Sequence, residues 1–80
     1  MKRATHRLVL PGGVVLAQIR LYANGRTDLE MHGELHVSRS PSLCDDVLMG
    51  RWREPVRYLY GPDSDAIPND ARIEKVLAAS

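Results

Sequence analysis

VVLAQIRLYANGRTDLEMHGELHV, residues 14–37, decides the fold of this chain. Two long runs of alternating apolar and polar residues flank Asn24-Gly25, a dipeptide that is typical of tight β-turns. Side chains of a strand point to opposite faces in turn, so each run gives a strand with one apolar and one polar face. The pattern therefore predicts a β-hairpin with one buried and one solvated face.

The register of this hairpin follows from its apolar residues. A two-residue turn at residues 24–25 would set Ile19 against Glu30 and bury carboxylates. A three-residue loop, residues 23–25, sets Ile19 against Leu29 instead. Because a slip of one residue inverts every side chain, the apolar pattern selects this loop, with Gly25 in a left-handed conformation. The same register pairs Ala17 with Met31, Leu21 with Thr27, and Arg20 with Asp28 on the solvated face.

A third strand is predicted ahead of the hairpin. Residues 5–10 can extend as a strand, and Pro11-Gly12-Gly13 supplies a turn into the hairpin. The expected pairs are Leu10 with Val15 and Leu8 with Ala17, which leaves His6 beside Ile19. Residues 5–38 should therefore form a three-strand antiparallel meander, and one face of it needs a cover.

The second half of the chain is expected to supply this cover. Ser40-Pro41 predicts a helix start, because Ser caps helices and Pro suits the first helical position. Its apolar stripe consists of Leu43, Val47 and Leu48. Residues 56–60, VRYLY, are assigned to a fourth strand, although the spacing from Leu48 through Trp52 to Tyr58-Leu59 also suits a continued helix. Asn69 predicts a final helix with a buried stripe of Ile73, Val76 and Leu77.

These elements define the expected fold class as α+β. Residues 1–80 should form one small domain, in which an antiparallel sheet of three to four strands is covered on one face by two short helices. The single cysteine, Cys44, rules out an internal disulfide. No apolar run approaches the length of a membrane span, and no signal peptide is apparent, so a cytoplasmic protein is expected.

Charge is distributed unevenly along the chain. Residues 1–26 hold five basic and no acidic residues, residues 28–46 are acidic apart from Arg39, and a second basic group follows in residues 51–57. The net charge is only +1. A dedicated DNA-binding domain carries a strong basic excess, and a DNA mimic carries a strong acidic one. The sequence fits neither class.

His32, Glu34 and His36 suggest a metal site, because His and Glu are ligands for zinc. On one strand, however, His32 and His36 would lie about 13 Å apart, so a solvated sheet face is the preferred interpretation. Motifs such as G-x-S-x-G, a phosphate-binding glycine loop and H-E-x-x-H are absent from the sequence. The expectation is a protein that is not an enzyme and binds no metal or cofactor.

The remaining candidate is a segment rich in arginine and aromatic residues. Protein interfaces enrich both residue types, and both stack on nucleic-acid bases. The predicted partner-binding residues are Arg51, Trp52, Arg53, Arg57, Tyr58 and Tyr60, with Arg20 and Arg26 of the hairpin. The alternative for Trp52 is a place in the thin core, with the arginines merely solvated.

The whole chain resembles the small anti-CRISPR proteins of phages and prophages, in particular inhibitors of type I systems such as type I-C. The resemblance covers the meander from Leu8 to Val37, the capped helices, the lone cysteine and the lack of catalytic motifs. It implies a protein that binds the Cascade surveillance complex in the bacterial cytoplasm and blocks target DNA. A monomer or weak dimer is expected. Mixed charge favours direct protein contact, or competition near the DNA channel, over DNA mimicry. The alternative function is a small nucleic-acid-binding protein that uses the arginine and aromatic surface.

Overall fold

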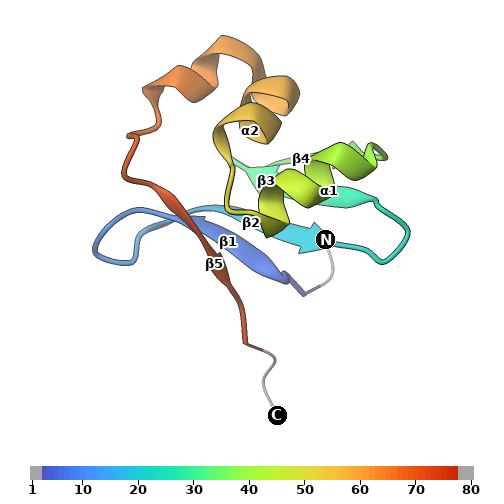
Figure 1. The fold of residues 1–80 in the computed structure, drawn as a ribbon. Coiled ribbons are helices and arrows are strands. Elements are labelled where there is room, and N and C mark those ends of the chain that lie inside the picture. The colour runs from blue at the N-terminus through green and yellow to red at the C-terminus, as the bar shows by residue number, and fades with distance from the viewer. Residues whose placement is uncertain (1–2, 78–80) are drawn as a thin grey trace.

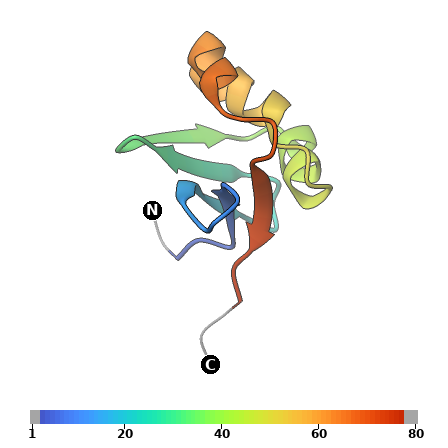
Figure 2. The same cartoon turned by 90° about the vertical axis from the view of Figure 1, so that its left-hand side faces the viewer.

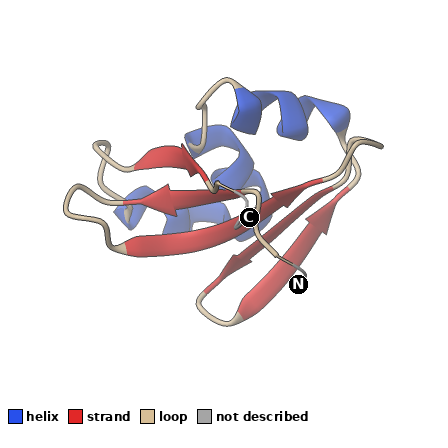
Figure 3. Ribbon diagram, turned by 90° about the horizontal axis from the view of Figure 1, so that it is seen from below, coloured by secondary structure: helices blue, strands red, loops and turns tan. Residues whose placement is uncertain are grey.

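The structure is a computed structural model that describes residues 3–77. A five-stranded antiparallel sheet forms one layer, and the helices lie against one face of this sheet (Figures 1 and 2). The strand order is β4-β3-β2-β1-β5, so β4 and β5 are the edges; Figure 3 shows the strands from below. The strands are β1 (His6–Val9), β2 (Val15–Leu21), β3 (Thr27–Met31), β4 (Glu34–Ser38) and β5 (Arg72–Lys75). The predicted α+β class and the N-terminal meander are confirmed.

The β2–β3 hairpin has the predicted register. Ile19 pairs with Leu29 and Leu21 pairs with Thr27. The three-residue loop is closed by a 3.0 Å hydrogen bond from the Tyr22 amide to the Arg26 carbonyl. Gly25 has a φ of +89°, a conformation that costs glycine little and other residues more.

The β1–β2 hairpin follows the prediction except at its turn. Leu8 pairs with Ala17, and His6 pairs with Ile19. The predicted pairing of Leu10 with Val15 is wrong, because a register shift after Leu8 sets Val9 against Val15. A bulge of this kind places one extra residue on one strand and increases the local twist.

The second run of the hairpin, residues 26–37, was expected to form one strand, and this prediction is wrong. A two-residue turn at His32-Gly33, with φ angles of 54° and 75°, divides them into β3 and β4. Such a turn needs positive φ at both positions, which suits glycine and is tolerated by histidine. Met31 pairs with Glu34 across the turn, so the apolar residues change faces. Leu29 and Met31 are buried, whereas Leu35 and Val37 lie half-exposed on the outer face of the sheet.

The predicted helix after Asn69 is a strand. β5 pairs with β1, with Ile73 opposite Leu8, and the Val76 amide donates a 2.9 Å hydrogen bond to the Thr5 carbonyl. Ile73 is only partly buried and Leu77 is 83% exposed, so the predicted buried stripe does not exist. The free edge of β1 provides hydrogen bonds that a four-residue segment cannot make within a short helix.

Two helices form the second layer. α1 (Pro41–Leu48) begins with Pro41 as predicted, but the Ser40 hydroxyl pairs with the Ser42 hydroxyl at 2.8 Å and makes no capping bond. It ends at Leu48, and the amides of Gly50 and Arg51 just beyond it donate to the carbonyls of Val47 and Asp46, the pattern of a Schellman motif.

α2 (Arg53–Tyr60) includes residues 56–60. The helical alternative for these residues is therefore correct, and their assignment to a fourth strand is wrong. The 3₁₀ helix η1 (Gly61–Ala66) follows it directly. Pro55 stands in the first turn of α2, where its missing amide hydrogen costs nothing. The chain then returns to the sheet as β5.

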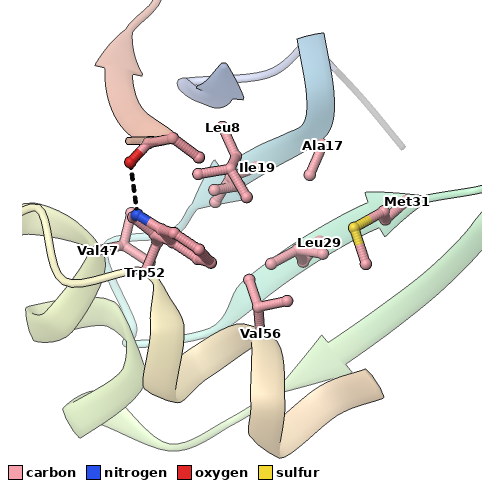
Figure 4. Close-up of a cluster of buried hydrophobic side chains, with 9 residues drawn as sticks. Leu8, Ala17, Ile19, Leu29, Met31, Val47, Trp52 and Val56 are labelled. Atoms are coloured by element: carbon pink, nitrogen blue, oxygen red, sulfur yellow. Dashed lines mark hydrogen bonds between the residues drawn. The ribbon is translucent and has the colours of Figure 1, made fainter. Parts of the chain in front are cut away.

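The core lies between the sheet and the two α-helices (Figure 4). Val47 of α1 and Val56 of α2 pack against the apolar face of the sheet, with Trp52 between the helices. No Phe is present, so one indole and several aliphatic side chains fill this thin core. The buried cluster comprises Leu8, Ala17, Ile19, Leu29, Met31, Val47, Trp52, Val56 and Ala71.

Candidate functional site

Trp52 and Arg53, two of the predicted partner-binding residues, are built into the fold. Trp52 is only 7% exposed, and its Nε1 donates a 2.7 Å hydrogen bond to the Ala71 carbonyl (Figure 4). The Arg53 guanidinium lies 4.1 Å from the centre of the Trp52 ring. It also donates to the carbonyls of Ser64 and Ile67 at 2.7 and 2.8 Å. These contacts connect α2 to residues 64–71, so both side chains have structural roles.

Arg51, Arg57 and Tyr58 face solvent. Arg51 contacts Asp46 at 3.0 Å and Arg57 contacts Asp65 at 2.5 Å, and both arginine side chains are more than half exposed. The hydrogen bond to Asp65, and then the negative charge of Asp65, raise the pKa of Arg57. Tyr58 is 73% exposed. Because residues 54, 57 and 58 share one helical face, α2 presents Arg57 and Tyr58 together with Glu54.

Tyr60 points toward the sheet. Its hydroxyl lies 3.1 Å from the carbonyl oxygens of both Leu29 and Glu34, and its ring meets the His36 ring edge-on at a centroid distance of 4.2 Å. Burial, together with the negative charges of Glu34 and Glu30, raises the pKa of Tyr60 to about 12. Tyr60 therefore stays a neutral donor that attaches the end of α2 to the β3–β4 hairpin.

Arg20 and Arg26 belong to a different surface. Both guanidinium groups lie against the Tyr22 ring, at 5.1 and 4.8 Å from its centre. Arg26 also holds Asp28 through two hydrogen bonds of 2.7 and 3.0 Å, and the Tyr22 hydroxyl donates a third at 2.9 Å. This group lies on the sheet face opposite to the helices, so the structure does not bring it together with the α2 residues.

Asp28 is the buried member of that group. The predicted pairing of Arg20 with Asp28 is confirmed, but the expected solvated position is wrong, because Asp28 is 2% exposed. Burial by itself would raise the pKa of Asp28, and the hydrogen bonds from Arg26 and Tyr22 outweigh it and lower the pKa below 3.8. The Arg20 guanidinium instead donates a 2.6 Å hydrogen bond to the Arg3 carbonyl.

The turn at His32-Gly33 changes the surroundings of His32, Glu34 and His36, which were expected to lie on a solvated sheet face. His32 lies in the turn, while Glu34 and His36 of β4 point to the helix side of the sheet, with 3.5 Å between His36 Nε2 and Glu34 Oε2. All three line a cavity of about 460 Å³ between the sheet and the α2–η1 segment. Within residues 3–77, no group of three or more His, Cys, Asp or Glu side chains has the geometry to hold a metal ion.

This cavity was not predicted from the sequence. Its walls are mostly apolar, with Leu16 and Met31 from the sheet and Ile67 and Pro68 after η1, and Asp63 adds a carboxylate. Its volume lies in the range of ligand pockets in general. In the sequence, the alternation of His32, Glu34 and His36 was the one available sign of this cavity. These residues lie beside residues 59–68 only because of the turn at His32-Gly33, which the alternation does not predict.

Comparisons with known proteins returned no match: no family model, curated protein or solved structure matches the chain. Within the described part of the chain, no helix is both long and apolar enough to span a membrane.

Proposed function

We propose that this protein is a non-enzymatic inhibitor that binds the Cascade surveillance complex of a type I CRISPR system and prevents Cascade from binding target DNA. The identity of the partner rests on the resemblance to small anti-CRISPR proteins. The mode of action, direct protein contact, rests on the solvent-facing side of α2.

The exposure of Tyr58 is the observation that carries the proposal. Its side chain is 73% exposed on a helix, directly beside the exposed Arg57. Tyrosine and arginine are enriched among the residues that dominate binding energy in protein interfaces. Trp52 and Arg53 fix α2 to the rest of the fold, so Tyr58 is presented on an ordered element. Binding through an ordered element loses less conformational entropy than binding through a loop.

The ion pair of Arg57 with Asp65 suits an exchange of partners. Both side chains are about half exposed, and exposed pairs of this kind contribute little to folding stability. Arg57 can therefore turn from Asp65 to a carboxylate of a protein partner at small cost to the fold. The net charge of +1 favours such a local contact over mimicry of DNA.

The test is gel filtration of the purified protein with type I Cascade, followed by a target-DNA binding assay. We expect co-elution with Cascade and loss of DNA binding. The double variant Arg57→Glu with Tyr58→Ala should weaken both effects by about tenfold or more. The matched control is Arg72→Glu, which makes the same charge change at an exposed position of β5. The absence of co-elution with any Cascade subunit, together with unchanged DNA binding, would refute the proposal.

Nucleic-acid binding is the second candidate, and the exposed Arg57-Tyr58 pair also favours it. Trp52 offers no stacking surface, because its ring is buried in the core. This alternative predicts direct binding of single-stranded or duplex probes with an affinity that falls steeply as salt rises. A mobility-shift assay at low salt that detects no complex would exclude it, and that result would leave the Cascade proposal intact.

A further inference from the structure

The two edges of the sheet differ in character. Three of the four residues of the β5 edge are charged, namely Arg72, Glu74 and Lys75, and charged edges resist pairing with other strands. The β4 edge carries Leu35 and Val37, which are 45% and 44% exposed on the outer face of the sheet. β4 pairs with β3 without a register shift and contains no proline or lysine. β4 has one carboxylate, Glu34, among its five residues, so its edge is less protected against strand pairing than the β5 edge.

The main-chain groups of β4 are oriented for a further strand. Met31 and Glu34 flank the two-residue turn and form the first hydrogen-bonded pair of the β3–β4 ladder. Hydrogen-bonded and non-bonded pairs alternate along an antiparallel ladder. Leu35 and Val37 therefore occupy the non-bonded positions. Their N–H and C=O groups point away from β3, toward the open edge of the sheet.

The cavity lies on the helix side of this same strand. Glu34 and His36 of β4 line it together with Tyr60 and Asp63, and Leu59, Ile67 and Pro68 form apolar walls. The two carboxylates face no lysine or arginine among the residues that line the cavity. A strand added to β4 would direct every second side chain toward this cavity and the intervening ones toward Leu35 and Val37.

We propose that the edge of β4 is a strand-addition site for an extended segment of a partner protein in which apolar and basic residues alternate. Main-chain hydrogen bonds to Leu35 and Val37 would hold the segment, as in other cases of β-strand addition. Apolar side chains of the segment would cover Leu35 and Val37 on the outer face. Its basic side chains would lie along the cavity and meet the carboxylates of Glu34 and Asp63, with the Tyr60 ring nearby.

This site is separate from the Arg57-Tyr58 surface and does not depend on the proposed function. The probe is a labelled peptide of alternating valine and arginine, and fluorescence anisotropy measures its binding to the full chain. The comparison peptide alternates valine and glutamate. We expect the arginine peptide to bind and the glutamate peptide not to bind. In an amide NMR titration of the wild-type protein, the largest shifts should occur at Leu35 and Val37.

Proline substitution tests the main-chain contact. Val37→Pro removes an outward N–H that β3 does not use, and proline is tolerated on edge strands. It should weaken binding of the arginine peptide by about tenfold, whereas Val37→Thr, which keeps the N–H, should bind nearly as well as the wild type. Lys75→Pro on the β5 edge is the second control and should leave binding unchanged. Glu34→Gln with Asp63→Asn should reduce the preference for arginine over glutamate.

Three results would overturn the proposal. Binding that is unaffected by Val37→Pro, with NMR shifts elsewhere, would place the peptide at another site. Equal binding of the arginine and glutamate peptides would remove the role of the acidic cavity. A concentration-dependent dimer in sedimentation analysis that Val37→Pro abolishes would mean that a second copy of the chain occupies the edge. Each of these results is independent of Cascade binding by Arg57 and Tyr58.

Discussion

The indole Nε1 of Trp52 donates a 2.7 Å hydrogen bond to the carbonyl of Ala71, 19 positions further along the chain. Both residues are buried, and Ala71 directly precedes β5. This bond therefore fastens the start of α2 to the point where the chain rejoins the sheet. It also gives a buried carbonyl the partner that it needs in the absence of water.

Trp52→Phe should lower the free energy of unfolding by about 1–3 kcal/mol, because the Ala71 carbonyl would remain buried without its donor. Much of the ring packing would be retained. Urea denaturation measures the change, and Tyr58→Phe is the control, since this side chain is exposed and should alter stability by no more than about 0.5 kcal/mol. Equal effects of the two substitutions would mean that the indole hydrogen bond contributes nothing measurable.

Asp28→Asn should destabilise the protein by about 1–3 kcal/mol, because it removes the charge that three hydrogen bonds from Arg26 and Tyr22 surround. The folded-state pKa of Asp28 lies below its ordinary value of 3.8. Its contribution is therefore complete above pH 3.8 and is lost as the pH falls below that value toward the folded-state pKa.

Acid titration of unfolding by circular dichroism tests this prediction. Below pH 3.8, the stability of the Asp28→Asn variant should fall less than that of the wild type. Asp45→Asn, at an exposed position of α1, should leave the acid profile nearly unchanged. An Asn variant with wild-type stability at pH 7 would show that the Arg26–Asp28 pair is energetically neutral.

His6 should make the fold weaker at mildly acidic pH. Burial, and then the positive charge of Lys75, lower the folded-state pKa of His6 below its ordinary value of 6.5. The unfolded chain therefore binds a proton more readily than the folded one. Stability is complete above pH 6.5 and falls as the pH drops from 6.5 toward the folded-state pKa.

Two variants separate the causes of this pH dependence. His6→Gln should abolish the slope of stability just below pH 6.5, and Lys75→Gln should make it shallower while burial remains. Thermal melting at a series of pH values measures both. A slope that persists in His6→Gln would assign the pH dependence to another group.

Apolar alternation was enough to predict the β2–β3 hairpin. Only one register buries Ile19 and Leu29 together, and that register is present. Beyond Met31 the same alternation gave a wrong prediction, because it continues through His32-Gly33 as if the strand did. A two-residue turn there places the later apolar residues on the opposite face of the sheet. β5 could not be predicted from four residues, since its partner is the open edge of β1, more than 60 positions earlier.

The candidate site was predictable to a lesser degree. The composition of residues 51–60 indicated an interface, but it could not separate Trp52 and Arg53 from Arg57 and Tyr58. The distinction depends on contacts of Arg53 with Ser64 and Ile67, and of Trp52 with Ala71, which lie 11 to 19 positions away. These contacts depend on the path of the chain after η1, and this path cannot be predicted from the pattern of residues within 51–60.

Gly25→Ala should destabilise the protein more than Gly12→Ala does. Both glycines have positive φ angles, +89° and +98°, so both substitutions introduce backbone strain of about 1–2 kcal/mol. A Cβ at Gly25 would also lie 3.3 Å from Cγ of Pro41, whereas a Cβ at Gly12 would meet nothing within 4 Å. The difference between the two losses therefore reports the contact of the β2–β3 loop with the start of α1.

A double-mutant cycle with Pro41→Ala isolates that contact. In the Pro41→Ala background the crowding is relieved, so Gly25→Ala should cost about as much as Gly12→Ala. Urea denaturation of the single and double variants provides the values. If Gly25→Ala and Gly12→Ala cost the same in the presence of Pro41, the loop moves away from α1 freely. The packing of α1 against this end of the sheet would then depend on the core residue Val47 and its neighbours rather than on the loop.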